Sequence, residues 1–208
     1  GRRFRADPSL GQRKIIYTHE CIAGKRRAIK LDDYPKTKAY LEQHRDVLEA
    51  RSYVLEAGRK WFELWVPQDP DVWPRTKLIF RDISEEPCFW IDQDGSVVNG
   101  DCYWLVAENK VDEDLLWLAA SVGNSKFIES FYDHSFNNKL YAGRRRFITQ
   151  YVEKFPLPDP SIKVSRQLVE LAKSLYDAID LPKARDIEAT INGLVFEVFG
   201  LGVEEVSR

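Results

Sequence analysis

The sequence contains no methionine, even at position 1, and only three cysteines among its 208 residues. Because Gly1 stands where an initiator methionine is usual, we expect the chain to be a piece of a longer product. Cys21, Cys88 and Cys102 form no C-x-x-C pair, and an odd number of thiols cannot complete a disulfide framework. This pattern excludes a disulfide-rich secreted scaffold and predicts buried thiols in a reducing compartment.

Long apolar runs are missing as well. No stretch approaches the roughly 18 consecutive apolar residues that span a bilayer, and no charged-then-apolar leader opens the chain. We therefore expect no membrane partner and a cytoplasmic protein. Hydrophobic residues make up 44% of the chain and aromatic residues 12%, so most of the sequence should fold around packed aromatic side chains.

The net charge of −2 hides a strong asymmetry along the chain. Basic residues gather in 1–30 and again in 134–152, whereas acidic residues dominate 81–114. If the two basic segments share one face, that face attracts polyanions in spite of the overall charge.

Hydrophobic periodicity predicts an α+β fold, with a mainly antiparallel sheet flanked by helices and a C-terminal helical pair. Short runs of β-branched and aromatic residues predict strands at 13–18, 25–31, 61–67, 77–83, 88–92 and 102–107. Apolar residues at helical spacing predict helices at 35–51, 112–122 and 124–133, and two more after the proline-rich stretch 156–160. We expect a sheet-centred domain, 1–158, and a helical hairpin, 159–208, packed on it.

Local features add detail to this outline. Pro35 suits the first turn of a helix, with Asp33 as a candidate cap. The segment 92–95 (DQDG) has the composition of a turn, which would make Cys88 and Cys102 cross-strand neighbours.

No residue pattern indicates chemistry in this chain. A domain that binds a methyl-donating cofactor needs a glycine-rich turn after its first strand, but the closely spaced Gly200 and Gly202 read as a helix C-cap. His19 and Cys21 lack the second pair of ligands that a zinc site requires. Asp133, His134 and Ser135 are adjacent in sequence, which does not give the relay of a catalytic triad. We predict no catalytic, cofactor-binding or metal-binding residue here.

One catalytic alternative remains open. A nuclease of the carboxylate-plus-lysine type needs a Pro-Asp step followed by an acid-x-Lys triplet. Pro70 and Asp71, with Glu108 and Lys110, match this pattern loosely.

The order of the aromatic segments carries a family resemblance. YPKTKAYLEQHRDVLEARS (34–52), KWFELWVPQD (60–69) and the aromatic stretch 76–106 occur in an order that resembles the TaqI-like C-terminal specificity domain of bacterial adenine-N6 DNA methyltransferases. The likeness runs from about residue 25 to the end and continues through LLWLAASVGNSKFIESFY (115–132), YAGRRRFITQYVEKFPLP (141–158) and INGLVFEVFGLGVEE (191–205). Leu157 between the prolines, and Phe199 where the family has Tyr, depart from its pattern.

This resemblance implies a function and partners. The chain would bind double-stranded DNA, recognise a short target and present the target adenine to a methyltransferase domain that uses S-adenosylmethionine. In many members of the family, as in type IIG restriction-modification enzymes, a nuclease domain that would use Mg²⁺ is also attached. The rival hypothesis is a protein-interaction module that docks a methyltransferase subunit without reading DNA.

DNA contacts are predicted first in the stretch 137–146. Asn137 and Asn138 could pair with an adenine edge, while basic side chains reach guanine or phosphate. In an extended segment Arg144 and Arg146 point one way and Arg145 the other. Lys126, at a helix start, is a candidate phosphate contact. The full set of predicted DNA-binding residues is Asn137, Asn138, Lys139, Arg144, Arg145, Arg146, Lys126, Lys25, Arg26, Arg27, Arg75 and Lys77.

Overall fold

The computed structural model describes residues 4–6, 13–98, 100–136, 139–178 and 181–202. Its contacts divide the chain into two compact units. The first, here called the sheet unit, is the chain from Pro74 onward together with the N-terminal residues around Phe4. The second, the hairpin unit, ends at Trp73. No helix among the described residues is long and apolar enough to cross a membrane.

The sheet unit is built on three antiparallel strands, β3 (Lys77–Arg81), β5 (Phe89–Asp92) and β6 (Cys102–Val106), in the order β5-β3-β6. Central β3 is buried along most of its length, as its apolar residues require. Its Phe80 ring lies 5.1 Å from Phe89 and 5.6 Å from Tyr103, so aromatic pairs join all three strands. The predicted antiparallel sheet is confirmed.

The two cysteines near this sheet are not cross-strand neighbours, so that expectation was wrong. Cys102 pairs with Arg81 of β3, and Cys88 precedes β5 on the opposite side of β3. The central strand therefore separates them. At the other edge of β5, the backbone N–H of Ile91 donates to the carbonyl of Phe4, a residue that is itself buried in the core.

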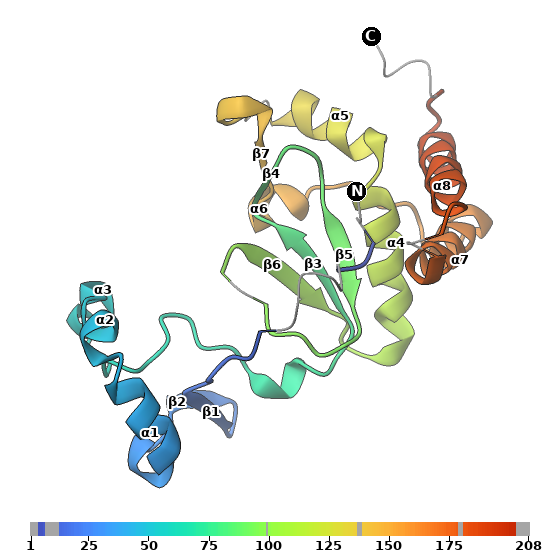
Figure 1. Ribbon diagram of the computed structural model, residues 1–208. Coiled ribbons are helices and arrows are strands. Elements are labelled where there is room, and N and C mark those ends of the chain that lie inside the picture. Colours follow the sequence, from blue (N-terminus) through green and yellow to red (C-terminus); the bar gives the residue numbers. More distant parts are fainter. Residues whose placement is uncertain (1–3, 7–12, 99, 137–138, 179–180, 203–208) are drawn as a thin grey trace. The chain divides into compact units, whose positions relative to one another are not determined.

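Helices cover the sheet (Figure 1), and α4 (Glu113–Gly123) packs on β3 and β5. The C-terminal pair, α7 (Lys163–Ala178) and α8 (Ala184–Val198), packs on α4 and on each other, which confirms the predicted hairpin. The described part of the sheet unit also contains η4 (Lys110–Asp112), α5 (Lys126–Ser135), η5 (Tyr141–Gly143), α6 (Thr149–Val152) and a small ladder of β4 (Ile83–Ser84) with β7 (Arg145–Arg146).

The contacts of these helices bear on the expected division of the chain. Ser121 of α4 donates its hydroxyl to the carbonyl of Leu168 in α7, and both residues are fully buried. The hairpin thus shares one core with the sheet. Residues on both sides of position 158 belong to the same compact unit, the sheet unit. A domain boundary between 158 and 159 stays a prediction. Phe199 is the C-cap residue of α8, and Gly200, with φ +71°, follows it in the left-handed conformation that commonly ends a helix.

The hairpin unit has a much smaller core, formed by Ile29, Leu31, Leu41 and Phe62. Its described elements are β1 (His19–Ile22), β2 (Lys25–Ala28), η2 (Leu31–Asp33), α1 (Pro35–Glu42), α2 (Arg45–Glu49), α3 (Ser52–Glu56) and η3 (Pro70–Val72). Pro35 occupies the first turn of α1 as predicted, but Tyr34 rather than Asp33 holds the N-cap position.

Three expected elements of this unit were wrong in extent or type. The strand at 13–18 is displaced, because pairing with β2 begins at His19. The helix at 35–51 is interrupted at His44, whose φ of −114° is not helical. No strand forms at 61–67, because arginine side chains bind carbonyl groups that a neighbouring strand would use. Arg51 donates to the carbonyl of Trp61, and Arg59 donates to the carbonyls of Leu64 and Trp65.

Candidate nucleic-acid interface

The basic loop of the sheet unit, here Lys139 to Arg146, leads from α5 into β7. A single bridge pairs Lys139 with Arg145, and β7 pairs with β4 through Ile83 and Ser84. The backbone N–H of Phe147 then donates to the carbonyl of Asp82. The loop is therefore tied at both ends. Asn137 and Asn138, the predicted adenine readers, lie outside the described residues.

Arg145 points into the protein and is only 7% exposed. Its guanidinium makes two 2.7 Å hydrogen bonds to the carboxylate of Asp133, lies 3.2 Å from Glu129 and donates to the carbonyl of Glu85. Hydrogen bonding from Arg145 holds the pKa of Asp133 below its ordinary value. Because a bidentate, nearly buried ion pair fixes it, Arg145 anchors the loop and cannot reach a phosphate.

Arg144 and Arg146 are exposed on either side of Arg145, which confirms the alternation expected of an extended segment. The guanidinium of Arg144 lies 5.7 Å from the ring of Tyr141 and has no acidic partner among the described residues. Arg146 lies 3.2 Å from Asp82, and Lys139 lies 2.9 Å from Asp133. Exposed pairs of this kind are worth about 0 to 1 kcal/mol, so a phosphate could displace either acid.

Lys126 begins α5, as predicted, but the site differs from a free helix N-terminus. Ser125 caps the helix by accepting from the N–H of Ile128, and the N–H of Lys126 donates to Asn192 at 2.8 Å. The exposed ammonium lies 3.0 Å from Glu129. The ammonium, not the helix N-terminus, is what remains available to a phosphate.

Lys77 is a buried structural cation. Its side chain has no exposed surface, and its ammonium lies 2.8 Å from the carboxylate of Asp92. A phosphate contact by Lys77 would require this pair to open inside the sheet, which corrects the prediction for this residue. Half-buried Arg75 lies beside it and lines a hollow of about 340 Å³ with Glu108, Lys110 and Glu113.

The third predicted group, Lys25, Arg26 and Arg27, occupies β2 in the hairpin unit and is exposed. Arg26 donates to the carbonyl of Pro67 at 3.2 Å, while Lys25 and Arg27 point to the opposite face of the strand. Strand β2, which carries this part of the first basic segment, therefore belongs to a different unit from the basic loop.

A family model for the TaqI-like C-terminal specificity domain matches residues 19–157. The chain belongs to this family.

Three curated relatives are type II methyltransferases. M.BanIII of Aneurinibacillus aneurinilyticus is 39% identical over 200 residues, which cover 96% of this chain and 34% of that protein. M.PaeR7I of Pseudomonas aeruginosa is 26% identical over 86% of this chain and 29% of its own length. M.BstVI of Geobacillus stearothermophilus is 26% identical over 64% of this chain and 23% of its own length. The specificity domain described here spans about a third or less of these relatives.

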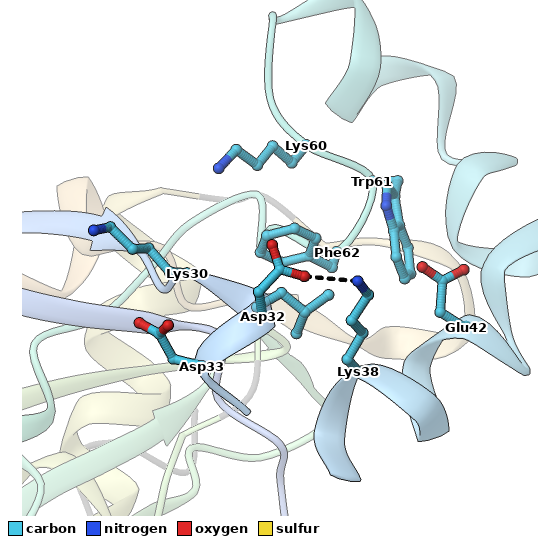
Figure 2. Close-up of a pocket in the computed structure, with 9 residues that line it drawn as sticks. Lys30, Asp32, Asp33, Lys38, Glu42, Lys60, Trp61 and Phe62 are labelled. Atoms are coloured by element: carbon cyan, nitrogen blue, oxygen red, sulfur yellow. Dashed lines mark hydrogen bonds and ion pairs between the residues drawn. The ribbon is translucent and has the colours of Figure 1, made fainter. Parts of the chain in front are cut away.

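The hairpin unit of the specificity domain also holds a pocket of about 410 Å³ (Figure 2). Trp61 and Phe62 form its aromatic wall, and Asp32 and Lys38 are joined across it by a 2.6 Å ion pair. The remaining charged side chains of its lining are Lys30, Asp33, Glu42 and Lys60. Cations and acids balance here, so the charge of the lining does not favour an anion.

The described residues of the specificity domain contain no cluster of three or more His, Cys, Asp or Glu side chains that could hold a metal ion. The acids of the nuclease alternative fall in different units, Asp71 in the hairpin unit and Glu108 with Lys110 in the sheet unit. His19 is buried and lies 3.6 Å from Glu63, and burial lowers the pKa of His19.

The role of Tyr132 could not be predicted from local sequence patterns. This fully buried tyrosine of α5 donates its hydroxyl to the carbonyl of Arg146 at 2.8 Å and accepts from the N–H of the same residue at 3.2 Å. It therefore fixes the backbone beside the exposed cations. No local pattern could reveal this contact, because the tyrosine lies on the apolar face of a helix, where a core role is the ordinary reading.

Proposed function

We propose that this specificity domain binds duplex DNA and selects a short target for an adenine-N6 DNA methyltransferase. The catalytic part, which would bind S-adenosylmethionine, belongs to the remainder of the protein. Membership of the specificity-domain family and the printed names of the relatives support this proposal. The domain itself would hold and position the DNA, and the target base would be extruded toward the catalytic part.

The observation that carries the proposal is that the basic loop has one buried arginine between two exposed ones. Arg145 is neutralised inside the protein by Asp133 and Glu129, whereas Arg144 and Arg146 are exposed on either side of it. A loop that only needed solubility would gain nothing from so firm an internal anchor. An anchored backbone with outward cations is what phosphate binding requires, since contacts to the DNA backbone set the register of a protein on the duplex.

The test is a salt titration of DNA affinity with purified protein. Each phosphate contact adds about 0.9 to the magnitude of the slope of log affinity against log salt concentration. The triple variant Lys139→Ala, Arg144→Ala, Arg146→Ala should therefore flatten the slope by roughly 2 to 3 units and weaken binding to every sequence. Arg144→Ala alone should lose more affinity than Lys139→Ala, because Lys139 must first leave Asp133.

Arg166→Ala is the matched control, since Arg166 is an exposed arginine on α7 of the same unit. It should leave both slope and affinity unchanged. If the triple variant behaves like this control, the basic loop is a solvated surface and does not bind DNA. The rival hypothesis is a module that docks a methyltransferase subunit without reading DNA. It would be favoured if the wild-type domain associates with the catalytic part but shows no affinity for DNA.

A further inference from the structure

The β1–β2 hairpin has two chemically different faces. Residues paired across an antiparallel ladder share a face, so the register places Glu20 with Arg27, and Ile22 with Lys25, on one side. Cys21 pairs with Arg26 on the other side. The two faces can be compared directly.

The face that carries Arg26 is fixed to the hairpin unit. His19, at the base of this face, is buried, and Ala28 opposite it packs against the small core. Arg26 donates to the carbonyl of Pro67. The neighbouring Thr18 hydroxyl donates to the carbonyl of Phe62 at 2.9 Å. These contacts hold this face of the β1–β2 hairpin against the rest of the hairpin unit.

The opposite face is open to solvent. Glu20, Lys25 and Arg27 are exposed, and Ile22 beside the turn is 48% exposed. Neither Lys25 nor Arg27 has an acidic partner within ion-pair distance among the described residues. Ile22 lies opposite Lys25 and beside Glu20 on this face, and it is not part of the core of the hairpin unit.

The turn makes the end of the ribbon narrow. Only Ala23 and Gly24 connect the strands, both in the left-handed region, with φ of 51° and 73°. Two-residue turns of this kind match the twist of the paired strands. Two strands about 5 Å apart fit within a major groove about 12 Å wide.

We propose that the exposed face of this hairpin enters the major groove of duplex DNA, with Lys25 and Arg27 on phosphates and Ile22 against a thymine methyl group. This inference rests on the proposed function and adds a second contact, in the other unit, to the basic loop. Charge favours DNA over a protein as the occupant. A protein interface core is depleted of charged residues, whereas this face surrounds a single apolar side chain with two cations and one acid, Glu20, and so carries a net positive charge.

The experiment starts by selecting duplexes from a random-sequence pool with the purified chain. The selected duplex is then titrated with variants of the hairpin. Lys25→Ala with Arg27→Ala should flatten the salt slope by roughly 1 to 2 units. Ile22→Ala should weaken binding about 5- to 10-fold without changing the slope, because the lost contact is apolar. Lys36→Ala, an exposed cation of α1 in the same unit, is the matched control and should change neither quantity.

A second arm tests the thymine contact itself. Replacing the thymines of the selected duplex with deoxyuridine removes their methyl groups, and the wild-type chain should then lose affinity about as much as Ile22→Ala does. The Ile22→Ala variant should lose nothing further on the deoxyuridine duplex. Chemical denaturation of each variant confirms that the hairpin unit is still folded.

The outcomes separate the two proposals. Selection of a sequence followed by unchanged affinity and slope in the hairpin variants would overturn the groove-binding hairpin and leave the proposed function intact. An equal loss on the deoxyuridine duplex for wild type and Ile22→Ala would overturn the thymine contact. Failure to enrich any duplex would contradict the proposed function and this inference together.

Discussion

The side-chain amide of Asn124 hydrogen bonds to both backbone polar groups of Phe89. Its Nδ2 donates to the carbonyl of Phe89 at 2.7 Å, and the N–H of Phe89 donates to its Oδ1 at 2.9 Å. Asn124 follows α4, so the end of a helix supplies β5 with the hydrogen bonds that another strand would otherwise make. Both residues are buried, and water cannot replace these bonds.

Asn124→Ala should lower the free energy of unfolding by about 2 to 4 kcal/mol, because it leaves a buried N–H and a buried carbonyl unsatisfied. Urea denaturation measures the loss. Gln167→Ala, an exposed amide on α7, is the control and should change stability by less than about 0.5 kcal/mol. Equal effects of the two substitutions would show that the amide contact is not stabilising.

Asp92→Asn should destabilise the sheet unit by about 3 to 5 kcal/mol, because it removes the carboxylate that pairs with the buried ammonium of Lys77. Burial raises the pKa of Asp92, but hydrogen bonds from Lys77 and Ser96 outweigh it and lower the pKa overall. Thermal or chemical denaturation at neutral pH measures the change. The exposed Asp94→Asn serves as control, and a loss no larger than that of Asp94→Asn would mean that the buried pair opens in solution.

Asp133→Asn should cost about 1.5 to 3 kcal/mol at neutral pH, because it removes a charged acceptor from Arg145. Its dependence on pH follows from the lowered pKa of Asp133. A carboxyl whose folded pKa lies below its unfolded value of about 3.9 stabilises the protein above that value. The contribution is lost as pH falls through the folded pKa.

The difference in stability between wild type and Asp133→Asn should therefore be constant from about pH 5 to 7 and shrink below about pH 4. Denaturation curves across this range measure it. Glu153→Gln, an exposed acid of the same unit, should show no comparable difference at neutral pH. A difference between wild type and Asp133→Asn that grows toward acid pH would contradict the assigned ion pair.

Leu175→Ala should lower stability by about 2 to 5 kcal/mol, because Leu175 on α7 is fully buried in the core of the sheet unit. Leu171→Ala, one turn earlier, should cost less, since Leu171 is only partly buried. The two leucines are a matched pair on one helix, and chemical denaturation compares them. Equal losses would mean that the packing of α7 on α4 and α8 differs from that described.

The sequence alone determined the elements whose signals are local. Apolar spacing was enough to predict α4, α7 and α8, and β-branched and aromatic runs were enough to predict β3, β5 and β6. The two-residue period of an extended chain also predicted that Arg145 points away from Arg144 and Arg146. In each case the pattern repeats with the geometry of the element, and no distant partner is needed to interpret it.

Only the tertiary structure decided which cations are neutralised. Lys77 and Arg145 look like their exposed neighbours in sequence, but Asp92 and Asp133 bind them inside the sheet unit. Tertiary contacts also decided the conformation of the aromatic run 61–67, which is irregular because arginine side chains donate hydrogen bonds to its carbonyls. Ion pairs and side-chain hydrogen bonds to carbonyls join groups that folding brings together. Packing, rather than the order of residues along the chain, therefore decides which of them form.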